Sequence, residues 1–203
     1  MRMNKMKYLV LGTSVGVALL GTAYFANNVW GADDGIPGIS AGDSSRPRMD
    51  VVDISSHQGN VTVGMFNTMK KYGVKMIIVK LSEGNYYRNP YAAEQIANAR
   101  AAGLRVGAYH YSTYSTTSEA TAEANYFVDT AQSLGLSDTT YMVDDLEAES
   151  TKTSNTTQLA ETFKRQVNNR GYGKTLLYTY ASYTQQHLCV VYAATRIEVQ
   201  CLG

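Results

Sequence analysis

The sequence has almost no net charge, because 18 Lys and Arg residues offset 17 Asp and Glu residues among its 203 residues. A nucleic-acid-binding protein needs a concentrated positive field, so this balance argues against a nucleic-acid partner. A disordered or fibrous chain is also excluded, since 44% of the residues are apolar and can bury a core. Length and composition together predict one globular domain.

Cysteine is scarce. Cys189 and Cys201 both fall in the last 15 residues, so no disulfide framework is predicted, although an exported chain could pair the two thiols. The motifs HExxH and GxSxG do not occur. Asp53, Ser55 and His57 are too close in sequence to form a Ser-His-Asp triad. We therefore expect no metal and no cofactor.

Tyrosine, by contrast, is abundant, with 16 residues. Its ring offers a flat apolar face and a polar tip, which suits the binding of sugars. A tyrosine-rich core or surface would have the same composition, so the count alone does not decide between the two.

The amino-terminal segment is basic and then apolar. Its cations precede an uncharged run of 19 residues, Tyr8–Ala26, and the first acidic residue is Asp33. This pattern predicts a secretory signal over residues 1–31. Because the run is close to the ~20 residues that span a bilayer, an uncleaved membrane anchor is the alternative. Residues 32–48 are rich in Gly, Ser, Asp and Pro and are predicted to be a linker, so the folded part is 49–203.

Short β-branched runs alternate with helical patterns in the folded part, which is typical of βα units around a parallel sheet or barrel. Five segments are predicted to be strands: Val51–Ile54, Met76–Leu81, Arg105–Tyr111, Thr140–Leu146 and Thr175–Tyr180. Three helices are predicted between them: Tyr91–Ala102, Ser118–Leu134, and a third through Leu159, Phe163 and Val167 that ends at Gly171. The expected fold is α/β.

Polar or aromatic side chains stand at the end of every predicted strand. In a parallel β/α barrel the reactive groups gather at the carboxyl ends of the strands. In chain order these ends carry Asp53; Glu83; Tyr109, His110 and Tyr111; Asp145 and Glu147; Tyr178 and Tyr180. Carboxylates that converge from separate strands are what a glycosidase needs.

Asp145 and Glu147 form the most specific pair. Residues two apart in a strand point to the same face, which puts their Cβ atoms about 6–7 Å apart. Two like charges this close raise the pKa of one group, so that one carboxyl can stay protonated while the other is an anion. An acidic, solvated loop would have the same sequence, and a shift of one residue in register would put Asp144 in place of Asp145.

Two further candidates have a structural alternative. Asp53 follows an apolar strand and could serve only as a cap for the next helix. His110, between two tyrosines on a strand, could be a core histidine bonded to a neighbour.

Four motifs stand in a recognisable order: DISSHQG at 53–59, IIVKLSEG at 77–84, AYHYS at 108–112 and VDDLE at 143–147. In order and spacing, from about Met49 to Tyr183, they resemble the glycoside hydrolase family 25 lysozymes, which are N-acetylmuramidases of bacteria and their phages. The resemblance implies a compact, irregular β/α barrel. It also implies cleavage of the β-1,4 bond between N-acetylmuramic acid and N-acetylglucosamine in bacterial peptidoglycan. Together with the predicted signal over residues 1–31, we expect a secreted monomer that acts in the extracellular cell wall.

The resemblance also implies roles for individual residues. Glu147 would be the general acid, Asp145 would stabilise the oxocarbenium-like centre or orient the N-acetyl group, and Asp53 would position or polarise the same region. Substrate binding is implied for five residues: Tyr109, Tyr111, Tyr180, Glu83 and His110. These residues are compatible with an attacking carboxylate, the acetamido group or a water as the nucleophile.

The sequence departs from the family pattern after Tyr183. The expected strands, one with Trp and Tyr and a last one with an aspartate, do not occur in residues 184–203. We therefore expect a truncated or frameshifted reading frame and a barrel that lacks its last strands. A barrel left open in this way would have low stability.

Two other functions stay open at this point. One is an inactive barrel that acts as a peptidoglycan-binding module. The other is a metal-dependent polysaccharide deacetylase, with ligands drawn from Asp53, His57, His110 and Glu147.

Overall fold

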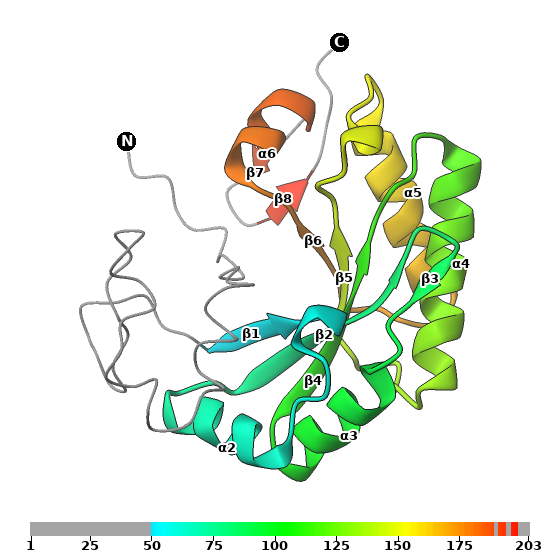
Figure 1. Ribbon diagram of the computed structural model, residues 1–203. Coiled ribbons are helices and arrows are strands. Elements are labelled where there is room, and N and C mark those ends of the chain that lie inside the picture. The colour runs from blue at the N-terminus through cyan, green and yellow to red at the C-terminus, as the bar shows by residue number, and fades with distance from the viewer. Residues whose placement is uncertain (1–49, 189–190, 194–195, 199–203) are drawn as a thin grey trace, which may run out of the picture. The chain divides into compact units, whose positions relative to one another are not determined.

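The computed structural model describes residues 50–188, 191–193 and 196–198, which fold as two compact units (Figure 1). Of the described residues, the first unit contains 50–80 and 90–107, and the second unit contains 81–89 and everything from 108 onward. The predicted signal (1–31), the predicted linker (32–48) and both cysteines lie outside the described residues. In the described parts of the chain, no helix is long and apolar enough to cross a membrane.

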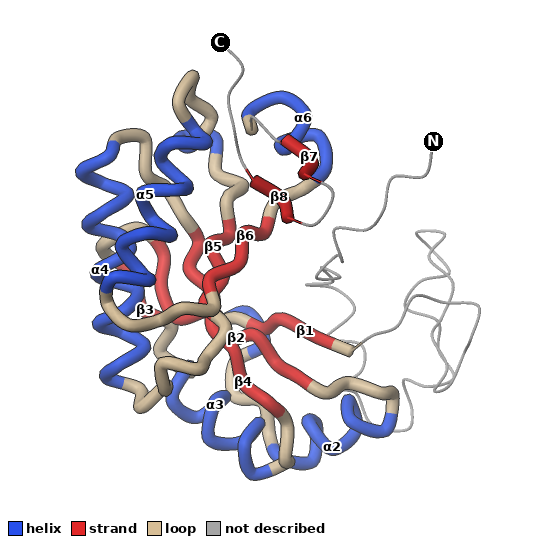
Figure 2. Tube along the Cα trace, turned by 180° about the vertical axis from the view of Figure 1, so that it is seen from behind, coloured by secondary structure: helices blue, strands red, loops and turns tan. Residues whose placement is uncertain are grey.

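The first unit is built on two parallel strands, β1 (Val51–Ile54) and the start of β2 (Met76–Glu83). Helices α2 (Val63–Lys71) and α3 (Ala92–Ala101) lie side by side (Figures 1 and 2). β-branched residues dominate both strands, which favours extended backbone. The core is formed by large apolar side chains that are fully or almost fully buried: Phe66, Met69, Ile77, Val79 and Ile96.

A short loop follows β1 and contains the 3₁₀ helix η1 (Ser56–Gln58). The side-chain amide of Gln95, on α3, donates hydrogen bonds to the backbone oxygens of Ser55 (2.8 Å) and Gly59 (2.7 Å). Gly59 has φ +59°, a conformation that glycine adopts without steric cost. One buried amide therefore fixes both ends of the turn that continues from β1.

Three parallel strands form the centre of the second unit: the end of β4 (Arg105–Tyr111), then β5 (Met142–Asp145) and β6 (Thr175–Tyr178). Figure 2 shows helices α4 (Thr117–Ser133) and α5 (Thr156–Asn169) packed side by side. The order of strands in the sheet is β1-β2-β4-β5-β6, and strands β2 and β4 each pass from one unit to the other.

The remaining elements are short. Strand β3 (Tyr87–Arg88) pairs antiparallel with the end of β2, the 3₁₀ helix η2 (Glu149–Thr151) follows β5, and α6 (Ala181–His187) follows β6. Strands β7 (Val191–Ala193) and β8 (Arg196–Glu198) form a separate antiparallel pair.

An aromatic cluster joins β4 to helices α4 and α5. The ring of Phe163 lies 5.4 Å from that of His110, 5.7 Å from that of Tyr114 and 6.2 Å from that of Phe127. All four side chains are fully buried, so this cluster is the core of the second unit and defines the helix-facing side of its strands.

The predicted α/β class is confirmed, with a parallel sheet and helices in the expected alternation. Two predicted strands are longer than observed, because β5 begins at Met142 and ends at Asp145, and β6 ends at Tyr178. Helices α2 and α6 were not predicted. Closure into a barrel, and the loss of its last strands, stay predictions.

Candidate active site at the carboxyl end of β5

A row of three side chains crosses the second unit near the carboxyl ends of its strands. Tyr111 on β4 is in register with Asp145 on β5, which is in register with Tyr178 on β6. Residues paired in this way share one face, with neighbouring strands about 4.8 Å apart. All three side chains are partly exposed. The pleat thus places a carboxylate between two phenols.

The neighbouring Asp144 lies on the opposite, helix-facing side. Its carboxylate accepts hydrogen bonds from Ser112 Oγ (2.5 Å) and Tyr114 Oη (2.8 Å), and only 2% of the residue is exposed. Burial raises the pKa of Asp144 to about 7, although the two hydroxyl donors oppose the shift. Asp145, rather than Asp144, therefore belongs to the exposed row.

Glu147 stands two residues past Asp145, just beyond the end of β5. Pairing with β6 continues for one more bond, because the Leu146 N–H donates to the Tyr178 carbonyl at 2.9 Å. Leu146 is fully buried, whereas Glu147 is half-buried and on the same side as Asp145. The alternation of the strand therefore extends past its formal end, as the spacing of the two acids predicts.

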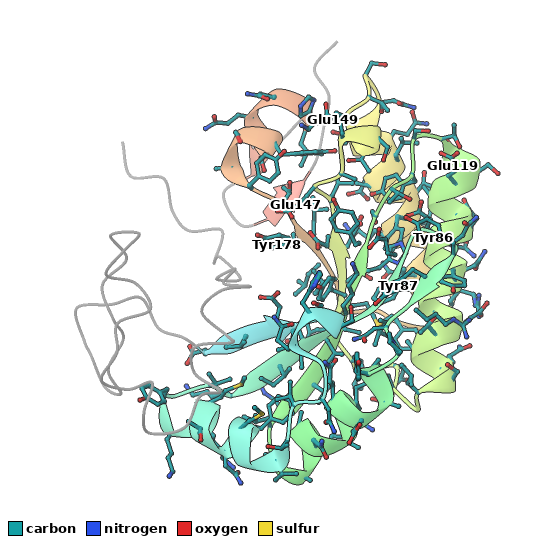
Figure 3. All side chains as sticks on the ribbon, viewed as in Figure 1. Tyr86, Tyr87, Glu119, Glu147, Glu149 and Tyr178 are labelled. Carbon is teal, nitrogen blue, oxygen red and sulfur yellow. The ribbon has the colours of Figure 1, made fainter. Side chains whose placement is uncertain are left out.

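The Glu147 carboxyl and the Tyr178 side chain lie next to each other in Figure 3, and the Tyr178 hydroxyl donates a hydrogen bond to this carboxyl. Burial raises the pKa of Glu147, and the hydrogen bond lowers it in part. A carboxyl in these surroundings holds its proton to a higher pH than one in water, which is the property of a general acid.

The raised pKa of Tyr111 shows which carboxyl groups lie near it. The pKa of its hydroxyl is raised, first by burial and then by the negative charges of Asp145, Glu147 and Glu83. Because such interactions fall off with distance, the three carboxyls lie near enough to this phenol to interact with it. Tyr180 also contributes to the shift. The second unit therefore brings together five of the residues singled out from sequence.

The remaining residues predicted for substrate binding differ in their exposure. Tyr109 is two residues before Tyr111 on β4, hence on the same face, and is partly exposed. Tyr180 is 38% exposed, and its ring packs edge-on against Tyr183 at 5.6 Å. Glu83, at the end of β2, accepts a hydrogen bond of 3.1 Å from the hydroxyl of the exposed Tyr86.

His110 lies in the core. Its ring is fully buried, with Nδ1 2.9 Å from Ser82 Oγ and Nε2 3.0 Å from Glu123 Oε2. Glu123 also accepts hydrogen bonds from the backbone N–H (2.9 Å) and hydroxyl (2.8 Å) of Thr113. Both ring nitrogens are thus engaged by protein groups, and the placement favours the alternative of a core histidine over a sugar contact.

Asp53 belongs to the first unit. It is the third residue of β1, is 8% exposed and is followed by Ser55, whose hydroxyl accepts the His57 N–H at 3.1 Å. Ser55 therefore caps the short helix η1, and the capping alternative for Asp53 is not needed to explain that turn. The catalytic role of Asp53 stays a prediction.

Sequence reasoning did not assign a role to Tyr178, and it overlooked Ser112 and Tyr114. Tyr178 shares a face with Asp145 because the two residues are in register across β5 and β6, and pairing between strands is not visible in one sequence. Among residues 50–188, 191–193 and 196–198, no three His, Cys, Asp or Glu side chains are grouped so as to hold a metal ion.

Known proteins are similar to this chain in sequence and in fold. The family described as "Glycosyl hydrolases family 25" matches residues 52–199, most of the chain. The autolytic lysozyme of Clostridium acetobutylicum is 35% identical over 85 residues, which cover 42% of this chain and 24% of that protein.

Solved structures of similar fold include a modular autolysin and a modular endolysin. The modular autolysin LytC of Streptococcus pneumoniae superposes with a TM-score of 0.61 at 18% identity and covers 68% of this chain, which in turn covers 34% of it. The modular Cpl-1 endolysin, solved with a peptidoglycan analogue, superposes with a TM-score of 0.54 at 26% identity. The match covers 68% of this chain and 38% of the endolysin chain. The chain thus spans a quarter to about two fifths of these relatives. The family match extends over most of the chain and agrees with the four motifs and the fold. The chain therefore belongs to family 25 of the glycosyl hydrolases.

Proposed function

We propose that this chain is a muramidase that cleaves the β-1,4 bond between N-acetylmuramic acid and N-acetylglucosamine in bacterial peptidoglycan. The observation that carries the proposal is the pair Asp145 and Glu147 at the carboxyl end of β5, in a chain that belongs to family 25. One acid of this pair is half-buried with a raised pKa, and the other stands beside it on the same face.

Glu147 is the general acid in this proposal. It donates a proton to the glycosidic oxygen as the bond to the sugar breaks, and its raised pKa lets it hold that proton to a higher pH than a carboxyl in water. Asp145 stabilises the positive charge that develops on the sugar ring, or it orients the N-acetyl group. The two tasks need different protonation states, which the different surroundings of the two carboxyls support.

The tyrosines of the same face supply contacts for the sugar rings. Tyr109 and Tyr111 on β4 and the exposed Tyr180 after β6 offer flat faces and hydroxyls to a polysaccharide, and Glu83 is assigned to binding or support near them. Asp53 keeps the role that the resemblance implies, and its Asp53→Asn variant tests that role separately. The partner is bacterial peptidoglycan, and the place of action is the cell wall outside the membrane.

The test compares the parent chain with Glu147→Gln in the clearing of a suspension of bacterial walls. Glutamine keeps the shape of the side chain but has no proton to donate, so the rate is expected to fall roughly 100-fold or more. Glu149→Gln is the matched control. Glu149 lies two residues on, in η2, where it is exposed and pairs with Lys152 at 2.6 Å, and its loss leaves the rate unchanged.

Equal clearing by the parent chain and Glu147→Gln would remove Glu147 from the role of acid. A parent chain that binds walls but neither clears them nor releases new reducing ends would instead be the peptidoglycan-binding module that the sequence leaves open.

A further inference from the structure

Tyr178 is tied to the segment Asp145–Glu147 at three points. It is in register with Asp145 across the β5–β6 pair, its carbonyl accepts the Leu146 N–H at 2.9 Å, and its hydroxyl donates to the Glu147 carboxyl. Its side chain points toward Glu147 in Figure 3. The backbone hydrogen bonds between β5 and β6 fix the position of the Tyr178 backbone. Its hydroxyl therefore bonds to Glu147 from a residue of a paired strand rather than of a loop.

We propose that Tyr178 is the positioning residue for the Glu147 carboxyl, an inference that rests on the proposed muramidase function. Its hydroxyl occupies one carboxyl oxygen as a donor. That oxygen is then the poorer place for the acidic proton, so the proton resides on the other oxygen, which is left to face the glycosidic bond. Tyr178 thereby selects the orientation of the acid without contacting the bond that breaks.

Other groups of the second unit face this end of β5. They are Asp145 on β5, Tyr111 on β4, and Glu83 and Tyr180, which both interact electrostatically with the Tyr111 hydroxyl. Burial of the Glu147 carboxyl favours its protonated form. The Tyr178 hydroxyl acts in the opposite direction, because a donated hydrogen bond stabilises the carboxylate form. The two effects can therefore be separated by the sign of a pH shift.

Tyr178→Phe tests the proposal, because it removes the hydroxyl and keeps the ring. Without the donor the Glu147 carboxylate is less stable, so the acid keeps its proton to higher pH. The basic limb of the kcat profile on soluble peptidoglycan fragments is expected to move up by about one pH unit. At the optimum, kcat falls roughly tenfold and KM changes less than about twofold, since orientation rather than binding is lost.

Tyr141→Phe is the matched control. Tyr141 precedes β5 at its other end, where its ring lies 5.1 Å from the Lys174 ammonium group, and its hydroxyl has no part in the proposal. This variant is expected to have the same basic limb of the kcat profile and the same kcat as the parent chain. A basic limb that stays in place in Tyr178→Phe overturns the inference. So does a raised KM at unchanged kcat, which would make Tyr178 a sugar contact.

A second variant covers the case in which Tyr178→Phe does not fold. Tyr178→fluorotyrosine keeps the hydroxyl and makes it a stronger donor, so the basic limb moves down instead of up. A shift in the same direction as that of Tyr178→Phe, or none, contradicts the proposal.

The inference and the proposed function fail in different ways. Carbon-13 titration of the Glu147 carboxyl, assigned with Glu147→Gln, reports its pKa in the full chain even without turnover. A higher pKa in Tyr178→Phe supports the bond whether or not the chain clears walls. If the parent chain is inactive but the Glu147 pKa rises in Tyr178→Phe, only the proposed function is wrong. If the parent is active and depends on Glu147 but the pKa does not rise in Tyr178→Phe, only the role of Tyr178 is wrong.

Discussion

Asp144 and Asp145 are adjacent in the sequence, yet the pleat of β5 places them in opposite surroundings. Asp145 stands among partly exposed phenols, while Asp144 is sealed among Ser112, Tyr114 and the aromatic cluster. A buried carboxylate without a cation is costly, so its proton is held to about pH 7. This raised pKa connects one core residue to the stability of the whole chain.

Asp144 is predicted to make the chain less stable as the pH rises. Its folded pKa of about 7 exceeds the unfolded value near 3.8. The folded state therefore binds the proton more tightly, and this contribution to stability is complete below about pH 4 and is lost as the pH rises through 7. The loss is at most about 4 kcal/mol.

Urea unfolding at several pH values, for the parent chain and Asp144→Asn, measures this effect. The parent should lose stability between pH 4 and 7 relative to the variant, which has no proton to release. Asp129→Asn, an exposed residue paired with Arg170 at 2.7 Å, is the control and keeps the parental slope. Parallel curves for parent and Asp144→Asn would show that Asp144 is not the titrating group.

Single residues differ in how far the sequence predicts them. Asp145 and Glu147 could be found because a spacing of two in a strand is a local rule that tertiary structure preserved here. His110 could not be assigned, because whether a histidine faces helices or solvent depends on what packs against its strand, and Ser82 and Glu123 are 28 and 13 residues away. A role for Tyr178 could not be predicted either, because it depends on the pairing of β6 with β5.

Among the elements, α4 has the most complete start signal. The Thr116 hydroxyl accepts the Glu119 N–H at 3.2 Å, and the Glu119 carboxylate accepts the Thr116 N–H at 3.0 Å, which is a capping box. Glu119 also accepts the backbone N–H and the hydroxyl of Ser115, and these bonds lower its pKa. The helix begins at Thr117, one residue before the predicted start.

Thr116→Ala is expected to lower the free energy of unfolding by about 1 kcal/mol, because it leaves the Glu119 N–H without its cap. Thermal or urea unfolding followed by circular dichroism measures the loss. Thr117→Ala, at the first helical position, removes a similar hydroxyl without touching the cap and should cost much less. Equal losses in the two variants would mean that the capping bond adds nothing.

Helices whose apolar residues recur at a regular helical spacing could be predicted from the sequence, and helices with few apolar residues could not. Helix α4 buries Ala120, Ala124, Phe127 and Ala131 at steps of four and three, a stripe visible in the sequence. Helix α2 buries only Phe66 and Met69 and contains Gly64, so its pattern is too short to stand out. Its capping Thr62 was the available signal.

At the scale of the whole molecule, continuity of β2 and β4 links the two units. Strand β2 runs without a break from Met76–Lys80 in the first unit to Leu81–Glu83 in the second. Loss of either unit therefore frays a strand of the other. This arrangement predicts a single cooperative unfolding transition rather than two.

Core truncations in each unit test that cooperativity. Phe66→Ala in the first unit and Phe163→Ala in the second each remove a fully buried ring, at an expected cost of about 3–5 kcal/mol. In each variant, circular dichroism and tyrosine fluorescence should report one shared, lowered midpoint in urea. A variant in which only part of the signal moves would show that the units unfold separately.

The division of the chain between the units also has a consequence for synthesis. The boundaries fall after Lys80, Asn89 and Gly107, so the polypeptide enters the second unit, returns to the first and leaves it again. On the ribosome, residues 81–89 emerge before residues 90–107, the segment with α3 that completes the first unit, and they must wait for partners made later. Neither unit is one uninterrupted stretch of the gene, so neither can be cut out, exchanged or duplicated as a single exon-like block.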